Sequence, residues 1–267
     1  MTVHFIGAGP GAADLLTLRA VRLIASSQIC VYAGTYLDTE VLSHCPPGAQ
    51  LIDSSTLSLD EITAHLVAAH QAGHDVARLC SGDPSIYSAL AEQARRLDRA
   101  AVPWDVTPGV PAYAAAAAII GRELTVPELA QTVILTRVQA ASTAMPATEE
   151  LERLAATRAT LVLHLAIRRT RELANRLVPF YGSDCPVAVI SRASQSDELV
   201  LRGTLADIGD QVEAAGLRMA AVIIVGPALA AEGFVDSHLY GTRVANRRDQ
   251  GAGSLVDGAC GSQMTAQ

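Results

Sequence analysis

Lysine is absent from this sequence, and all twenty cationic residues among its 267 are arginines. This absence excludes a P-loop lysine, a pyridoxal Schiff base and a lysine nucleophile or base. Charged residues are few, at 18%, whereas hydrophobic residues make up 50% and the mean hydropathy is +0.27, so the chain can bury a substantial core. The net charge of −7 argues against a nucleic-acid partner that is held by bulk positive charge.

Disulfide and membrane signals are missing as well. The five cysteines form no C-x-x-C pair, and Cys30 and Cys80 lie in apolar, strand-like runs where a thiol acts as a small hydrophobe. No basic stretch followed by an apolar one opens the sequence, so we expect no signal peptide. The longest apolar run, Ala112–Ile120, is about half of the roughly 20 residues that a bilayer requires. These features predict a cytoplasmic protein with no membrane partner.

Short apolar runs alternate with helix-period segments in the first half of the sequence. The strands are expected at Val3–Ile6, Ile29–Tyr32, Val76–Cys80 and Trp104–Val106, and the helices at Thr17–Ser26, Leu59–Ala72 and Ser88–Leu97. Ser58 and Glu61 form a capping-box pattern at the start of the second helix, which Gly73 should end. Such alternation predicts crossover connections and a mostly parallel sheet that is covered on both faces.

The same alternation restarts in the second half. Its strands are expected at Thr132–Thr136, Leu161–Leu165, Val187–Ile190 and Ala221–Val225, and its helices at Glu149–Ala156, Arg168–Val178 and Leu205–Ala214. The fold class is therefore predicted as α/β, with two α/β domains of mostly parallel sheets and a cleft between them. We place the domains at residues 1–122 and 123–242. Residues 243–267 have almost no apolar pattern and are expected to form a disordered tail.

The first expected strand leads into a glycine-rich loop, Gly7-Ala8-Gly9-Pro10-Gly11-Ala12. The loop satisfies G-x-G-x-x-G/A, a dinucleotide-binding pattern, and also the G-x-G-x-G pattern of many S-adenosylmethionine methyltransferases. Both kinds of site need a carboxylate near the end of the second strand, where the first acid is Asp38, beyond the turn. Pro10 also removes one backbone N–H from the loop. A structural tight turn that lines a cleft is therefore the favoured interpretation.

A second loop, Ser81–Tyr87, follows the expected central strand at its carboxyl end, where open α/β sheets bind ligands. Gly82 allows a ligand to approach the backbone, and Pro84 can start the next helix. Asp83 offers a carboxylate that would suit a ribose or a sulfonium cation. The alternative is that Asp83 only caps the helix.

Three motifs, each after an expected strand, together resemble the tetrapyrrole methylase family: Gly7-Ala8-Gly9-Pro10-Gly11, Gly82-Asp83-Pro84 and Pro108-Gly109-Val110. The resemblance covers roughly residues 2–240. It implies two α/β domains with S-adenosylmethionine in the cleft between them, S-adenosylhomocysteine as the product, and a homodimer. Three further stretches resemble the family members that methylate a precorrin in corrin biosynthesis: Tyr32–Thr35, Gly82–Tyr87, and Glu123–Glu128 running into Gln131–Arg137. The uroporphyrinogen-III methyltransferases carry an Asp where Ala33 stands.

The resemblance also implies the site, residue by residue. It places these residues at the cofactor: Pro10, Ser81, Gly82, Asp83, Ile86, Pro111, Ala112, Leu165 and Ala193. Among them, Pro10 would also border the tetrapyrrole, and Leu165 and Ala193 would lie near the adenosine. Ser81 stands where related methylases often have Gly, and Pro111 where many have Thr. For the tetrapyrrole substrate the candidate residues are Tyr32, Gly34, Tyr87 and Arg137.

No residue is expected to act as a catalytic acid, base or nucleophile. A sulfonium is a strong methyl donor and a partly reduced tetrapyrrole is an enamine-like nucleophile, so positioning and exclusion of water should suffice. Because the protein is acidic, local arginines must pair with the substrate carboxylates, with Arg137 as first choice and Arg122 and Arg192 as second. No metal site is expected. His164 could touch a ligand, but a hydrogen-bonded core residue is the default expectation.

Two functions outside the methyltransferases remain open at this point. One is a nicotinamide-dependent oxidoreductase built on Gly7–Ala12, which would bind NAD(H) and not S-adenosylhomocysteine. The other is a ligand carrier that binds a cofactor or a tetrapyrrole without turnover. Within the family, other precorrins or cobalt-precorrins are alternative substrates.

Overall fold

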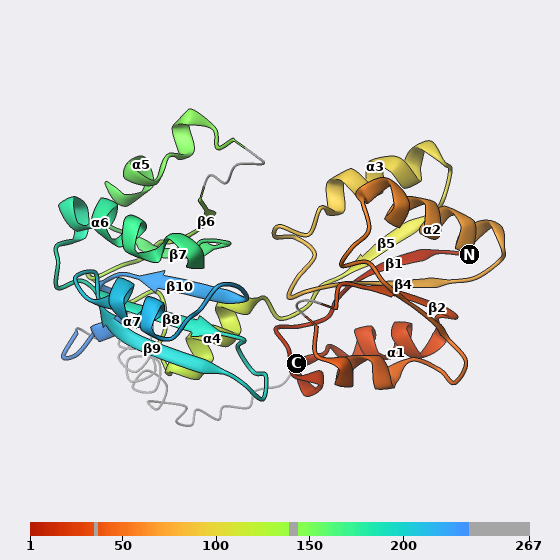
Figure 1. Cartoon of the computed structure of the whole chain (residues 1–267), viewed down its shortest axis with the longest axis horizontal. Helices are drawn as coiled ribbons and strands as arrows, with labels where there is room; N and C mark the ends of the chain where they lie inside the picture. Colours follow the sequence, from red (N-terminus) through yellow and green to blue (C-terminus); the bar gives the residue numbers. More distant parts are fainter. Residues whose placement is uncertain (35–36, 139–143, 235–267) are drawn as a thin grey trace, which may run out of the picture.

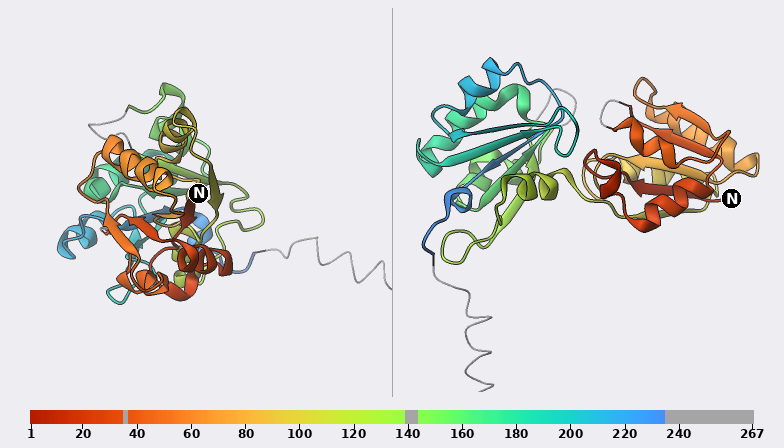
Figure 2. Two further views of the ribbon diagram at one scale, coloured as in Figure 1. Left: turned by 90° about the vertical axis from the view of Figure 1, so that its right-hand side faces the viewer. Right: turned by 90° about the horizontal axis from the view of Figure 1, so that it is seen from below.

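The structure is a computed structural model that describes residues 1–34, 37–138 and 144–234, and it contains two five-stranded sheets, one in each half of the chain (Figure 1). The sheets belong to two lobes that lie side by side, joined by the segment that leads into helix α4 (Figure 2). The predicted fold class, two α/β halves, is confirmed. The predicted tail at residues 243–267 lies outside the described residues.

All five strands of the N-terminal lobe are parallel, in the order β3-β2-β4-β1-β5. Their bounds are β1 Val3–Gly7, β2 Ile29–Tyr32, β3 Gln50–Asp53, β4 Val76–Cys80 and β5 Trp104–Thr107. The helices are α1 Leu18–Ser26, α2 Leu59–Gln71 and α3 Leu90–Arg99. Sequence patterns did not predict β3, because this edge strand is largely exposed and lacks an apolar run.

Helices cover both faces of this sheet, as predicted. Helices α2 and α3 pack on one face through Leu66 and Leu97, and α1 packs on the other through Ile24 (Figure 1). All three side chains are fully buried, and each such burial stabilises the fold by about 1.5–3 kcal/mol. The predicted capping box of α2 is confirmed, because the Ser58 hydroxyl accepts from the Glu61 N–H and the Glu61 carboxylate accepts from the Ser58 N–H.

The sheet of the C-terminal lobe is mixed, in the order β6-β7-β10-β8-β9. Its strands are β6 Val133–Arg137, β7 Thr160–His164, β8 Pro186–Ser191, β9 Leu199–Thr204 and β10 Ala221–Val225. The helices around it are α4 Ala112–Ile120, α5 Leu151–Ala155, α6 Thr170–Tyr181 and α7 Ile208–Ala214. Short 3₁₀ helices also occur among the described residues, at Ala13–Leu15, Thr39–His44, Ala147–Glu149, Ile167–Arg169 and Pro227–Ala230.

Only β6 and β7 pair in parallel in this second sheet, which departs from the expected mostly parallel arrangement. Strand β10 runs antiparallel to both β7 and β8, and β8 and β9 form an antiparallel pair. A short loop at residues 192–198 joins β8 to β9, and only an antiparallel pair can be closed by so short a connection. As a result, the carboxyl ends of β7 and β8 meet the amino end of β10 at one edge.

The second sheet is also covered on both faces. Helices α5, α6 and α7 pack on one face, and α4 packs on the other against Val162, Ile190 and Val222. Helix α4 therefore covers the second sheet, although it precedes residue 122. The proposed domain boundary between residues 122 and 123 stays a prediction. Across residues 1–34, 37–138 and 144–234, no helix combines the length and the apolar character that crossing a membrane requires.

Candidate active site

Three glycines from three loops are in backbone contact where β4, β1 and β5 end. A Cβ atom on Gly109 would lie 2.3 Å from the Gly82 carbonyl oxygen, and one on Gly7 would lie 2.4 Å from the Gly109 nitrogen. Neither position has room for a side chain. Since the three strands are parallel neighbours, their loops leave the same edge of the sheet. The three motifs noted in the sequence therefore form one packed unit.

The glycine-rich loop after β1 uses its backbone groups within the protein. The Gly82 N–H donates to the Gly9 carbonyl at 2.7 Å, and the Gly9 N–H donates to the Gly82 carbonyl at 3.2 Å. The Ala12 N–H donates to the Ser194 hydroxyl of the C-terminal lobe at 3.1 Å. Pro10 has no N–H at all. Because these groups are already paired, the loop is a tight turn rather than a cradle for a pyrophosphate.

Asp83 ties the second loop to the third. One carboxylate oxygen accepts the Gly109 N–H at 2.8 Å, and the other accepts the Ser85 N–H at 2.8 Å. Partial burial raises the pKa of the carboxyl, but the hydrogen bonds from Ser85 and Gly109 outweigh it and leave the pKa below its ordinary value. Asp83 does not cap the following helix, and Pro84 does not start it, because α3 begins only at Leu90.

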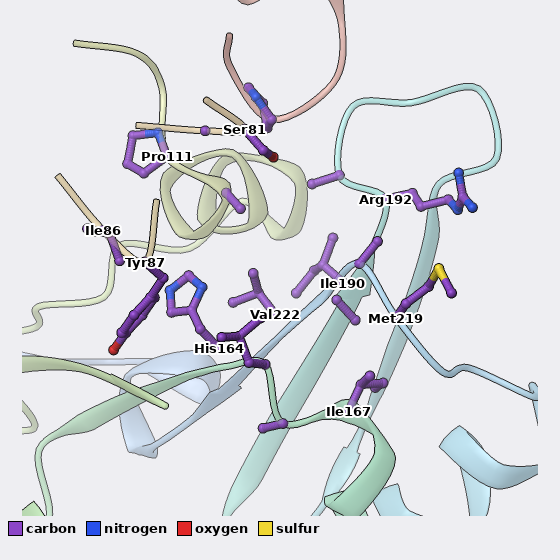
Figure 3. A pocket seen from close by; sticks show the side chains of 18 of the residues that line it. Ser81, Ile86, Tyr87, Pro111, His164, Ile167, Ile190, Arg192, Met219 and Val222 are labelled. Carbon is purple, nitrogen blue, oxygen red and sulfur yellow. The ribbon is translucent and has the colours of Figure 1, made fainter. Parts of the chain in front are cut away.

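A cavity of about 690 Å³ lies between the two lobes, next to these loops (Figure 3). Every residue predicted at the cofactor lines it, together with one predicted substrate residue: Pro10, Ser81, Gly82, Asp83, Ile86, Tyr87, Pro111, Ala112, Leu165 and Ala193. They come from three segments of the N-terminal half and two of the C-terminal half. The volume falls within the range of roughly 300–1,000 Å³ that is usual for small-molecule sites.

Three predicted substrate residues do not line this cavity. Tyr32 and Gly34 lie at the carboxyl end of β2, where the Gly34 N–H donates to the Asp53 carboxylate at 3.1 Å. Arg137 ends β6, next to His164 on β7, and its guanidinium donates to the Ala144 carbonyl at 3.3 Å. The positive charge of Arg137 also acts on the Tyr87 hydroxyl. These three residues remain predictions.

The C-terminal lobe supplies most of the lining that sequence patterns missed. The additional residues are His164, Ala166, Ile167, Arg168, Arg169, Ile190, Arg192, Gln195, Arg218, Met219, Ala220, Ala221 and Val222. Of these, Arg192 was a second choice for the substrate carboxylates. The segment at 218–222 reaches the site because β10 runs antiparallel to β7 and β8, and nothing in the sequence pattern reveals that direction.

Backbone strain is concentrated around the cavity. Tyr87, Leu165, Arg192 and Ala220 all line it and have left-handed φ angles of 53°, 55°, 48° and 53°. Such a conformation costs a non-glycine residue of the order of 1 kcal/mol or more. Leu165 was expected to continue its strand, but β7 ends at His164 and the turn leaves the Leu165 side chain 68% exposed. Strain of this kind is typical of functional sites.

In the described part of the chain, the one buried side-chain nitrogen or oxygen without a hydrogen bond is the Nε2 atom of His164, a partly buried residue. The expectation of a hydrogen-bonded core histidine is therefore wrong, because its Nε2 atom has no partner. Its ring packs on the Tyr87 ring, with centroids 5.5 Å apart, and Ile86 and Val222 lie nearby (Figure 3). Burial lowers the pKa of the imidazole, which is neutral at neutral pH.

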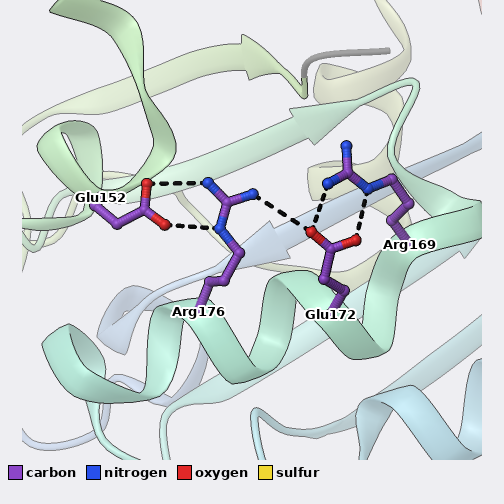
Figure 4. A network of polar contacts seen from close by, with 4 residues as sticks. All are labelled: Glu152, Arg169, Glu172 and Arg176. Carbon is purple, nitrogen blue, oxygen red and sulfur yellow. Dashed lines mark hydrogen bonds and ion pairs between the residues drawn. The ribbon is translucent and has the colours of Figure 1, made fainter. Parts of the chain in front are cut away.

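Arginines make the C-terminal wall of the cavity basic. Asp83, on the N-terminal side, is the one acidic residue among the described residues that line the cavity. The Arg192 guanidinium pairs with Asp197 at 3.2 Å, and the Arg168 guanidinium donates to the Arg218 carbonyl at 3.1 Å. Arg169 belongs to a chain of ion pairs that continues through Glu172 and Arg176 to Glu152 (Figure 4). No group of three or more His, Cys, Asp or Glu side chains is placed to hold a metal within the described ranges.

Comparison with known proteins places these features in a family. The model of the Tetrapyrrole (Corrin/Porphyrin) Methylases matches residues 2–209. The precorrin-4 C(11)-methyltransferase of Rhodococcus erythropolis is 60% identical over 240 residues, which are 90% of this chain and 96% of that protein. The cobalt-precorrin-4 C(11)-methyltransferase of Methanocaldococcus jannaschii is 36% identical over 89% of this chain and 92% of its own.

Solved structures agree with this assignment. The X-ray structure of a cobalt precorrin-4 methyltransferase of cobalamin biosynthesis is similar with a TM-score of 0.82 and 33% identity, over 85% of this chain and 95% of that one. The uroporphyrin-III C-methyl transferase of Thermus thermophilus, solved with S-adenosyl homocysteine, is similar with a TM-score of 0.72 and 27% identity, over 86% and 93% of the two chains. This chain belongs to the tetrapyrrole methylase family.

Proposed function

We propose that this protein transfers a methyl group from S-adenosylmethionine to carbon 11 of precorrin-4, which gives precorrin-5 and S-adenosylhomocysteine. The observation that carries the proposal is that the predicted cofactor residues, drawn from five separate segments, converge on one cavity between the lobes. The precorrin-4 methyltransferase of Rhodococcus erythropolis, 60% identical over 90% of this chain, supports the same reaction.

The cavity suits S-adenosylmethionine, which supplies an electrophilic methyl group on a sulfonium. Gly82 has a φ of +67°, and an added Cβ atom would meet Pro111 and Ala112 at 3.5 Å, so the glycine keeps the backbone open beside these residues. Ile86, Ile190 and Val222 offer apolar surface. We therefore assign cofactor binding to the predicted residues, with Ser81–Asp83 as the N-terminal contact and Leu165 and Ala193 as the C-terminal one.

The protein's own part in the reaction is to hold two reactants in line and to exclude water. Holding reactants in the reactive orientation can lower a barrier by about 7–11 kcal/mol. Asp83 fixes the loop through Ser85 and Gly109 and so holds the donor side, without itself exchanging a proton. No lysine exists to act as a base, and no nucleophilic side chain is required. Loss of any one residue should therefore leave measurable activity.

The tetrapyrrole substrate is expected at the end of the cavity near Tyr87. Arg137 lies beside this end, on the strand next to that of His164, and Arg192 lines the cavity wall. A guanidinium can pair with a carboxylate through two parallel hydrogen bonds, which suits a substrate with several carboxylates. Tyr32 and Gly34, at the carboxyl edge of the N-terminal sheet, would extend this surface.

Cobalt-precorrin-4 is the second candidate substrate. Relatives named for metal-free precorrin-4 are 49–60% identical to this chain, whereas those named for cobalt-precorrin-4 are 34–36% identical. This difference favours the metal-free substrate. The same family relationship supports a homodimer, which light scattering would test. The four described cysteines are free thiols, which suits a reducing, cytoplasmic location.

The deciding experiment supplies the protein with S-adenosylmethionine labelled with ¹³C in the methyl group and with precorrin-2, precorrin-3, precorrin-4 and cobalt-precorrin-4 in turn. We expect a new methyl resonance at carbon 11 with precorrin-4. Methylation of precorrin-2 or precorrin-3 instead would overturn the assignment of precorrin-4 as the substrate, but the protein would still be a precorrin methyltransferase. Failure with every acceptor, together with binding of NAD(H), would overturn the reaction class.

A further inference from the structure

A single unpaired polar atom interrupts the apolar end of the cavity. The Nε2 atom of His164 is buried and has no hydrogen-bond partner, whereas the neighbouring Ile86 and Val222 offer only carbon. A buried polar atom without a partner is costly, and most such atoms in proteins are paired. When a residue that lines a ligand cavity has a hydrogen-bonding atom without a partner, the ligand is expected to supply that partner.

The surroundings of His164 indicate which ligand this is. Its ring packs on Tyr87, which follows the Gly-Asp-Pro motif and is 47% exposed. Arg137 lies beside His164 across the β6–β7 pair. Both Arg137 and Glu149 act electrostatically on the Tyr87 hydroxyl. Two ring faces next to a guanidinium suit a flat, conjugated molecule that carries carboxylates. These features match the tetrapyrrole rather than the methyl donor.

We propose that the Nε2 atom of His164 accepts a hydrogen bond from a ring N–H of the tetrapyrrole and so positions the carbon that is methylated. The inference rests on the proposed function. Nε2 is covered in this structure, so the substrate must displace part of that cover to reach it. The Asp83 carboxylate already accepts from Ser85 and Gly109, whereas Nε2 of His164 has no partner.

The hydrogen bond gains strength during the reaction. The new carbon–carbon bond uses the electron pair of the enamine and replaces the methyl–sulfur bond, whose pair stays on sulfur. The ring nitrogen therefore gains positive charge, and its proton passes to the solvent when the product leaves. A neutral imidazole that accepts from this N–H stabilises the charge as it forms. Interactions that are stronger in the transition state than in the ground state raise kcat. His164 therefore contributes to the rate more than to substrate binding.

The proposal predicts a pH dependence with a definite sign. Burial lowers the pKa of His164 below its ordinary value of 6.5, so the imidazole is neutral at neutral pH and, with its proton on Nδ1, can accept a hydrogen bond at Nε2. Acid protonates the imidazole, and the protonated ring cannot accept a hydrogen bond. The single-turnover rate should therefore fall as the pH drops through this lowered pKa. Tyr87, Arg137 and Glu149 are the other titratable groups that face the two rings.

Three variants of His164 test the inference. His164→Phe keeps the ring on Tyr87 and removes the acceptor, and we expect the single-turnover rate to fall roughly 10- to 100-fold. His164→Gln places an amide oxygen near the position of Nε2 and should recover part of the rate. Its rate should not fall at low pH, because an amide does not titrate there. His164→Asn is too short to recover the rate. His65→Phe, on the exposed face of α2, is the matched control. The affinity for S-adenosylhomocysteine should not change in any of them.

A measurement on the wild-type protein avoids any dependence on how the variants fold. In protein labelled with ¹⁵N-histidine, the His164 signals are identified by their loss in His164→Phe. Precorrin-4 added with S-adenosylhomocysteine should shift Nε2 as an unprotonated acceptor, and S-adenosylhomocysteine alone should not. A protonated Nε2 in that complex would overturn the inference, as would a wild-type rate or a weakened S-adenosylhomocysteine affinity in His164→Phe. If wild-type protein leaves precorrin-4 unmethylated, the proposed function fails instead.

Discussion

The two lobes contribute to the cavity in different ways. The N-terminal lobe presents backbone, in three loops that pack glycine against glycine at the ends of parallel strands. The C-terminal lobe presents side chains, several of them on residues with strained backbone, and most of the cavity's charge. One lobe is therefore built to hold a fixed shape, and the other to supply chemically varied contacts.

The largest effect should come from breaking the backbone unit of the N-terminal lobe. Gly109→Ala would place a Cβ atom 2.3 Å from the Gly82 carbonyl, so the loops must move apart. We expect a loss of about 3 kcal/mol or more in the free energy of unfolding, measured with urea. Gly73→Ala is the control, because it has a positive φ but open space, and should cost about 1 kcal/mol. Equal costs in the two variants would contradict the packing account.

A smaller effect is expected from removing the carboxylate that joins these loops. Asp83→Ala should weaken S-adenosylhomocysteine binding about 10- to 100-fold, since three hydrogen bonds to the charged group, two from Ser85 and one from Gly109, are lost. Because the pKa of Asp83 is lowered on folding, its stabilising contribution is present above its ordinary pKa of 3.8 and is lost as the pH falls below it. Calorimetry measures the binding. A variant that binds normally and is inert would contradict the positioning role.

At Leu165, the effect of backbone strain on stability can be separated from the effect of the side chain on binding. Leu165→Gly relieves a φ of +55° and should raise the stability by up to about 1 kcal/mol, while it weakens S-adenosylhomocysteine binding several-fold through lost apolar contact. Leu165→Ala keeps the strain and should weaken binding without the gain in stability. Unfolding and binding measured on both variants test this. Unchanged binding in both would remove Leu165 from the site.

The smallest effect should come from the basic wall. Arg218→Ala removes an exposed guanidinium from the cavity rim, and the KM for the acidic tetrapyrrole should rise about two- to five-fold at low salt. The difference should shrink at high salt, because exposed charges are then screened. Arg158→Ala, outside the cavity, is the control. An effect of Arg218→Ala that does not depend on salt would argue against a charge-mediated role.

Local patterns predicted most of the elements, and the resemblance selected residues that the structure brings together at one cavity. The capping box at Ser58, the end of α2 and every strand with an apolar run lie where they were expected, because each depends on neighbouring residues alone. The three glycine motifs could be recognised together because their close contacts allow no other residue. The strand β9 was missed, since it is a half-exposed edge strand without a strong apolar run.

Features that depend on distant partners could not be predicted in this way. The direction of β10 decides that residues 218–222 reach the cavity, and no local pattern encodes it. The unpaired Nε2 atom of His164 likewise depends on what packs around the ring, so a histidine in an apolar strand gave the wrong expectation. The left-handed turn at Leu165 occurs without a glycine, so no residue type in the sequence indicates it.

A crystal structure of this protein with S-adenosylhomocysteine is the most direct test of where the methyl donor binds. The account predicts the ligand in the cavity between the lobes, against Ser81–Asp83 on one side and Leu165 and Ala193 on the other. A ligand that lies instead along Gly9–Ala12, with the cavity unfilled, would contradict it.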